Sequence, residues 1–129
     1  MDSKKAATFL AANRIAIGAA LAAMPGLTTR GWIGAHAENP GARLMARAAG
    51  GRDVGIGGGI LYALARSGKR RKRRAALRPW LEAAALADLV DMAATLAARR
   101  ALSPTGLTLG VGIAGASAAA HLWLREELG

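Results

Sequence analysis

The chain has 129 residues, of which 53% are hydrophobic and only 4% aromatic, and its formal net charge is +10. This length allows one domain or one helical bundle, and the scarcity of aromatic residues argues against an ordinary soluble core. The absence of cysteine excludes disulfides and thiolate metal sites. His36 and His121 lie far apart in the sequence, with no carboxylate at metal-site spacing, so we expect no metal and no cofactor.

The first predicted membrane helix covers residues 6–24 and follows two lysines, Lys4 and Lys5. Its apolar length is sufficient for one crossing of a bilayer. The segment is similar to an export signal, but Asn13 and Arg14 interrupt the apolar run, so we expect a retained helix. Arg14 either snorkels to the near interface or pairs with an acid on another helix.

The second predicted helix covers residues 40–65. Asn39 supplies an N-cap, and Pro40 occupies the first helical position, where proline is favoured. Residues 25–40 predict an irregular connection before this helix, with Trp32 as an anchor at the outer membrane interface.

Three glycines at four-residue spacing predict a face of the second helix that packs closely on another helix: Gly51, Gly55 and Gly59. The alternative is a phosphate-binding loop of a soluble nucleotide-binding protein. That pattern fails, because Ile60 stands where the last glycine of G-x-G-x-x-G should be. Arg52 and Asp53 lie inside the same apolar helix, where charges persist only if they face a partner, a bundle interior or water.

A strongly basic segment, Arg66–Arg78, holds eight of the 18 basic residues. Between two apolar helices, it predicts a cytoplasmic loop under the positive-inside rule. Five consecutive side chains are expected to bind anionic lipid headgroups: Arg70, Arg71, Lys72, Arg73 and Arg74. Nonspecific nucleic-acid binding is the alternative, but no aromatic residue interleaves the run to stack on bases.

The last two predicted helices cover residues 79–98 and 104–124. Asp88 and Asp91 are three residues apart and share one face of the third helix, which we expect to look inward. The fourth helix carries a close-packing ladder that includes Gly106 and Gly110. His121 is expected to be an interfacial or hydrogen-bonded residue rather than a ligand or proton carrier.

Four crossings would place both termini and the basic loop in the cytoplasm. At a rise of about 1.5 Å per residue, four charged side chains fall at overlapping depths and predict one buried layer: Arg14, Arg52, Asp88 and Asp91. Asp53 points roughly 100° away from Arg52 around the helix. We therefore expect this surplus acid to pair with Arg47, to face another subunit, or to be protonated.

Four short motifs stand out along the chain: Arg14-x-x-x-Gly18, Trp32, Gly51-Arg52-Asp53-Val54 with the glycines that follow, and Asp88-x-x-Asp91. Together they resemble the pattern of small four-helix bacterial membrane proteins of about the size of the DoxX-like group. The resemblance spans most of the chain and implies the architecture, with no catalytic residues. The preference for Arg over Lys and the abundance of Ala and Gly favour a high-GC bacterial genome, and hence the plasma membrane.

The sequence thus predicts a single all-α domain, residues 1–129, folded as an up-and-down bundle of four transmembrane helices with short loops. We expect a structural or interaction subunit, either a homo-oligomer or an accessory subunit of a membrane complex. The alternative is a transporter or binding protein that uses the buried charges for a proton, an ion or a small anion. An enzyme is not expected, because no nucleophile–base pair or metal set is present. The sequence names no substrate.

Overall fold

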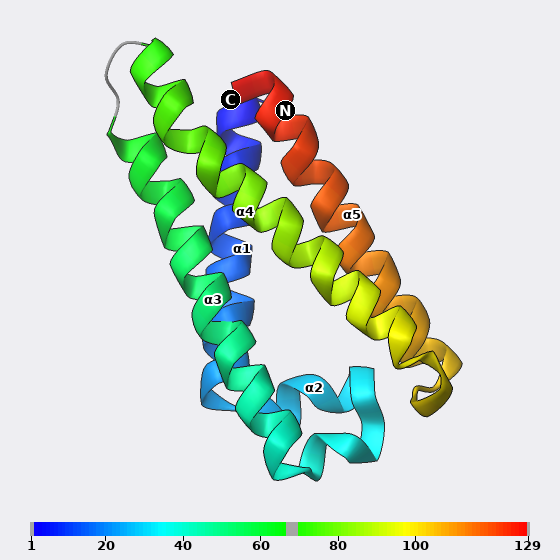
Figure 1. Ribbon diagram of the computed structural model, residues 1–129. Helices are drawn as coiled ribbons and strands as arrows, with labels where there is room; N and C mark the ends of the chain where they lie inside the picture. The colour runs from blue at the N-terminus through cyan, green and yellow to red at the C-terminus, as the bar shows by residue number, and fades with distance from the viewer. Residues whose placement is uncertain (1, 67–69, 129) are drawn as a thin grey trace.

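The structure, a computed structural model, describes residues 2–66 and 70–128, and every regular element in these ranges is helical (Figure 1). The elements in chain order are α1 (Ser3–Ala23), α2 (Pro25–Ile33), η1 (Gly34–Glu38), α3 (Pro40–Ala65), α4 (Arg70–Ala97), η2 (Arg99–Ala101) and α5 (Pro104–Leu128). The predicted all-α class is confirmed.

The four long helices alternate in direction and form two antiparallel pairs, α1 with α3 and α4 with α5 (Figure 1). The pairs meet through contacts of α3 with α4 and of α1 with α5. They converge at the end that holds both termini and separate toward the other end, where α2 lies between them (Figure 1).

The predicted bounds of the second helix match α3 because its start is encoded locally. The Asn39 side chain accepts hydrogen bonds from the backbone N–H groups of Gly41, at 2.8 Å, and Ala42, at 3.3 Å. These bonds satisfy donors that have no partner within the helix, and Pro40 has no N–H to satisfy. Asp2 caps α1 in the same way, accepting from the N–H of Lys4 at 3.1 Å.

The prediction of a basic loop up to residue 78, with a helix starting at Pro79, is wrong. Helix α4 begins at Arg70, so Pro79 lies inside it. The reason is that the buried face continues upstream: Leu77 and Leu81, one turn apart, are both completely buried. Arg, Lys and Ala are good helix formers, so the intrinsic preference of the basic run is compatible with this longer helix. Residues 67–69 of the predicted loop lie outside the described ranges.

The connection predicted at residues 25–40 is also more ordered than expected, because it folds into α2 and η1. Helix α2 contacts α1, α3 and α5. Glu38, at the end of η1, pairs with Arg30 at 2.7 Å and also with Arg43. The hydrogen bond from Arg30 and the charge of Arg43 lower the pKa of Glu38 below its ordinary value.

The interior is made of small and mid-sized residues, whereas large apolar side chains are exposed along the long helices. Completely buried positions include Ala11, Ile60 and Ala84. Exposed apolar side chains occur on all four long helices: Phe9, Ile17, Leu44, Val54, Leu86, Val90, Leu109 and Ile113. Among the described residues, two helices, α1 and α5, are long and apolar enough to cross a membrane.

Candidate functional site

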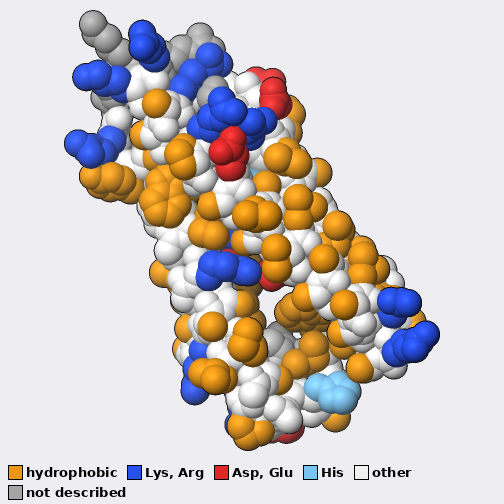
Figure 2. Space-filling view, viewed as in Figure 1, with side chains coloured by type: hydrophobic (Ala, Val, Ile, Leu, Met, Phe, Trp, Pro, Cys, Tyr) orange, Lys and Arg blue, Asp and Glu red, His pale blue; other side chains and the backbone are white. Residues whose placement is uncertain are grey.

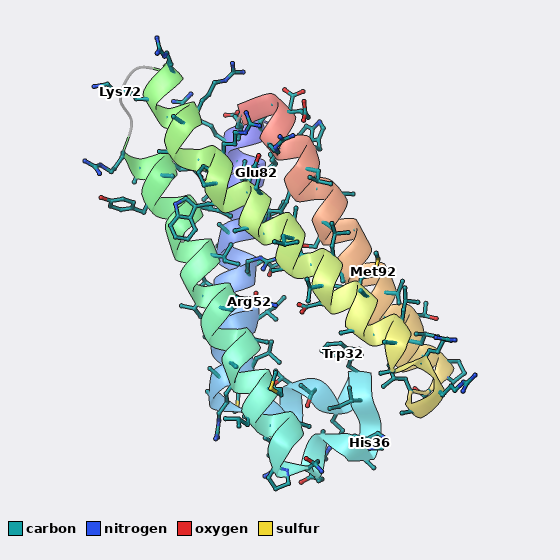
Figure 3. All side chains as sticks on the ribbon, in the orientation of Figure 1. Trp32, His36, Arg52, Lys72, Glu82 and Met92 are labelled. Carbon is teal, nitrogen blue, oxygen red and sulfur yellow. The ribbon has the colours of Figure 1, made fainter. Side chains whose placement is uncertain are left out.

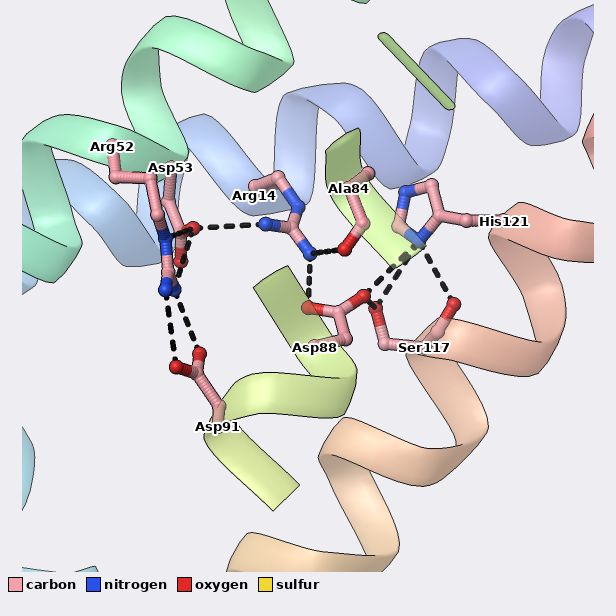
Figure 4. A network of polar contacts seen from close by, with 8 residues as sticks. All are labelled: Arg14, Arg52, Asp53, Ala84, Asp88, Asp91, Ser117 and His121. Atoms are coloured by element: carbon pink, nitrogen blue, oxygen red, sulfur yellow. Dashed lines mark hydrogen bonds and ion pairs between the residues drawn. The ribbon is translucent and has the colours of Figure 1, made fainter. Parts of the chain in front are cut away.

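Seven polar side chains from four helices form one connected network in the middle of the molecule (Figure 4). Helix α1 contributes Arg14, α3 contributes Arg52 and Asp53, α4 contributes Asp88 and Asp91, and α5 contributes Ser117 and His121. All five charged residues that the sequence predicted to be buried lie in this network.

Asp53 is the centre of the network rather than its surplus acid, and the expected pairing with Arg47 is wrong. Its Oδ1 atom accepts from Arg14 at 2.8 Å and from Arg52 at 3.1 Å. Arg47 instead donates to the backbone oxygen of Ala22 at 3.1 Å. Asp53 therefore links α1 to α3 and gives both arginines a shared partner.

Arg52 and Asp91 form a two-pronged ion pair between α3 and α4. The Nη1 and Nη2 atoms of Arg52 donate to the two carboxylate oxygens of Asp91 at 3.1 and 2.7 Å. The side chains are 32% and 34% exposed, so this pair forms the outer edge of the network. Parallel donation to a carboxylate fixes the geometry as well as the charge of both groups.

Arg14 and Asp88 form the inner part of the network, where the side chains are only 6% and 9% exposed. The Nη2 atom of Arg14 is paired with Oδ1 of Asp88 and lies 3.4 Å from the backbone oxygen of Ala84. Arg14 thus contacts both a carboxylate of α3 and a carboxylate of α4. The snorkelling alternative for this arginine is not what the structure shows.

Sequence reasoning did not place Ser117 or His121 at this site. Ser117 donates to Oδ2 of Asp88 at 2.7 Å, and His121 Nδ1 lies 3.2 Å from the same oxygen. The imidazole is 1% exposed and has its Nδ1 atom 2.8 Å from the backbone oxygen of Ser117. Because both neighbours accept hydrogen bonds, Nδ1 carries a proton. The four-residue spacing of Ser117 and His121, which puts them on one helical face, was the available sequence clue.

The network holds one carboxylate more than it holds guanidinium groups, since Arg14 and Arg52 face three aspartates. His121 is the remaining side chain that could carry a positive charge there. Its Nε2 atom is buried and has no hydrogen-bond partner in the described part of the chain.

The serine, histidine and aspartate do not form a nucleophilic triad. In that arrangement the serine hydroxyl donates to one imidazole nitrogen while the acid holds the other nitrogen. Here Ser117 donates to Asp88, and the same nitrogen, Nδ1 of His121, lies near both groups. No group of three or more metal-ligating side chains occurs within residues 2–66 and 70–128. The absence of enzymatic activity stays a prediction.

An opening lies beside the network, between α3 and α4, and a basic side chain borders it (Figure 2). Arg52 lies at this position, and Trp32 lies on the opposite side of the opening (Figure 3). The exposed outer pair, Arg52 and Asp91, is thus the part of the network that solutes reach first.

The predicted glycine ladders are used only in part. Gly59 packs on the ring of Trp80, while Gly106 and Gly110 pack on the backbone and the indole of Trp32. A side-chain carbon at Gly51 or Gly55 would meet nothing within 4 Å, so neither glycine packs on another helix within the described chain. The two helices α1 and α3 instead approach each other closely at Gly18 of α1 and Gly50 of α3.

Comparison of the chain with protein-family models, curated proteins and solved structures gave no match, so these comparisons lend no support to the resemblance to the DoxX-like group.

Proposed function

We propose that the protein is a four-crossing membrane protein that acts as a structural or interaction subunit, held together by the arginine–aspartate network. The observation that carries this proposal is the distribution of side chains. The charged side chains in the middle of the helices are paired with one another, with Arg14 and Asp88 buried and Arg52 and Asp91 about one-third exposed. Large apolar side chains face outward on every long helix. This is the arrangement that suits a lipid environment, where buried charges face the bundle interior and large exposed apolar patches are tolerated.

The network supports crossings by α3 and α4 as well as by the more apolar α1 and α5. Arg52 and Asp53 of α3 pair with residues of α1 and α4, and Asp88 and Asp91 of α4 pair with residues of α1 and α3. Pairing lowers the cost of carrying these charges into hydrocarbon. Both termini and the basic start of α4 lie at the same end (Figures 1 and 2), which the positive-inside rule assigns to the cytoplasm.

Membrane insertion and orientation are tested together. We expect the protein to stay in the membrane pellet after carbonate extraction. A cysteine replacing Ala101 should react with an impermeant thiol reagent added to intact cells, whereas one replacing Lys5 should react only after lysis. Both positions are exposed, so accessibility reports the side of the membrane. Release by carbonate would refute membrane insertion, and the reverse labelling pattern would refute the orientation.

An open glycine face on α3 supports an interaction role. A side-chain carbon at any of three positions, Gly51, Gly55 or Gly58, would meet nothing within 4 Å. Their spacing puts them on one side of the helix, where small residues let a second helix approach closely. We infer that a second copy or a partner membrane helix packs there.

Replacing Gly55 with leucine should therefore reduce assembly. We expect cross-linking of the purified protein in detergent to give oligomers that are largely lost in Gly55→Leu, because the added side chain blocks close approach. Gly112→Leu is the matched control, since Gly112 of α5 is equally open and lies on another helix. A monomeric wild type would exclude a second copy as the occupant of this face, and equal loss in both variants would contradict the interface.

A second candidate is a proton-coupled binding or transport protein, which the partial exposure of Arg52 and Asp91 at the opening favours. The test is proton flux into liposomes that contain the wild type or the double variant Arg52→Leu with Asp91→Leu. Removing both partners leaves neither charge of the pair stranded, so the double variant should fold. Flux in the wild type that this variant abolishes would support transport, and absence of flux in both would exclude proton transport.

A further inference from the structure

We propose that a pocket at the terminal end of the protein binds the phosphate group of an anionic phospholipid that carries a single negative charge. The pocket has a volume of about 360 Å³ and is lined by Lys4, Arg73 and Arg74, with Asp2, Ser3 and Glu127 beside them. This volume lies in the range of ordinary ligand sites. The inference rests on the proposed membrane location and identifies which basic residues recognise the lipid.

Three segments that are distant in the sequence build the pocket: the start of α1, the first turns of α4 and the end of α5 (Figure 1). Arg73 and Arg74 precede the buried Leu77 by four and three residues, so they lie on the face of α4 that turns toward the bundle. Both are half-buried, whereas Arg71 and Lys72 are exposed. Within the basic run, Arg73 and Arg74 therefore face the pocket, whereas Arg71 and Lys72 face solvent.

The cations of the pocket are available to a ligand. No ion pair joins the side chain of Lys4, Arg73 or Arg74 to a carboxylate in the described ranges. Arg78, one turn further along the same helix, instead pairs with Glu82. Guanidinium groups donate two parallel hydrogen bonds to phosphate oxygens, which makes arginine well suited to this ligand.

The charge of the pocket favours a phosphodiester over a more highly charged phosphate. Among the described lining residues, three cations face two carboxylates, and the Asp2 carboxylate is engaged in capping α1. The resulting balance matches the one negative charge of a phosphodiester headgroup such as phosphatidylglycerol. Leu128 also lines the pocket and packs against the hydrophobic core, so the pocket adjoins the core on this side. The lining residues that the structure describes include no aromatic side chain for stacking nucleic-acid bases.

Two double variants on the same helix test the site. We expect Arg73→Gln with Arg74→Gln to weaken binding of phosphatidylglycerol by about tenfold or more, as the loss of charge-assisted hydrogen bonds predicts. Arg71→Gln with Lys72→Gln removes the same charge from exposed positions and should change binding by no more than about twofold. Binding is measured on the purified protein in neutral detergent by native mass spectrometry, with phosphatidylcholine as the uncharged comparison.

Equal weakening in the two double variants would overturn the pocket, because it would show attraction to charge alone. Displacement of phosphatidylglycerol by inorganic phosphate at similar concentration would overturn the lipid assignment in favour of a free phosphate ion. Failure of the membrane proposal is seen separately, as release of the wild type by carbonate. A protein that stays in the membrane while Arg73→Gln with Arg74→Gln binds normally would refute the pocket alone.

Discussion

Replacing Arg14 with methionine is expected to lower the free energy of unfolding by about 3–5 kcal/mol, because one partner of a buried ion pair is removed while the other partners stay charged. Arg14 is the most buried guanidinium of the network and contacts both Asp53 and Asp88. Asp53 would keep Arg52, but Asp88 would have no guanidinium partner in the described structure. Unfolding in mixed micelles, followed by circular dichroism, measures the change.

The control for this variant is Arg47→Met, which removes the same charge from an exposed position. Arg47 donates only to a backbone oxygen at 3.1 Å in the described structure, so the expected change is within about 0.5 kcal/mol. The double variant Arg14→Met with Asp88→Asn should recover at least about 1 kcal/mol, because the stranded charge is removed too. A double variant as unstable as Arg14→Met alone would show that the two residues are not coupled.

The buried charge cluster could be predicted from the sequence, including the balance of Arg14 and Arg52 against Asp88 and Asp91, but the pairing of Asp53 could not. Single charged residues inside apolar helices require partners. The helical rise per residue places these charged residues at similar depths in the predicted membrane. The angle at which each helix faces its neighbours is set by packing between helices. The contact of α1 with α3 brings Arg14 next to Asp53, and no feature of α3 alone could show this.

The position of His121 in the network also could not be predicted from the sequence. Counting residues from the end of the fourth predicted helix placed it near the interface, where a polar aromatic residue needs no partner. The structure has α5 extending to Leu128, four residues beyond the predicted end, and His121 is completely enclosed beside Asp88. An error at a helix end thus moved a network residue out of the predicted site.

Local chemistry was the most informative guide to helix boundaries. The Asn39–Pro40 cap predicted the start of α3, because both residues act through hydrogen bonds within a few positions. Pro79 misled for the same reason: proline favours a first turn, yet it is tolerated inside α4 where burial of Leu77 and Leu81 holds the helix on both sides. Tertiary burial outweighs the local preference here.

Replacing Gly50 with alanine is expected to separate α1 from α3 and to destabilise the protein by about 1–3 kcal/mol, the usual cost of overpacking. A side-chain carbon at Gly50 would overlap the backbone oxygen of Gly18 and would lie 2.8 Å from the backbone nitrogen of Ala22. Backbone atoms cannot rotate away as a flexible side chain could, so the helices themselves must move. Arg14 and Asp53 lie within one turn of this contact, so the 2.8 Å ion pair between them should lengthen as well.

Gly51→Ala is the matched control, since it makes the same substitution one residue along the same helix. A side-chain carbon at Gly51 would meet nothing within 4 Å, and alanine is favoured over glycine in a helix by about 1 kcal/mol. We therefore expect Gly50→Ala to lower the free energy of unfolding and Gly51→Ala to raise it, both measured in mixed micelles. Because the helix-propensity gain is the same at both positions, the difference between them isolates the close approach of α1 to α3. Equal stability of Gly50→Ala and Gly51→Ala would show that the helices do not depend on this contact.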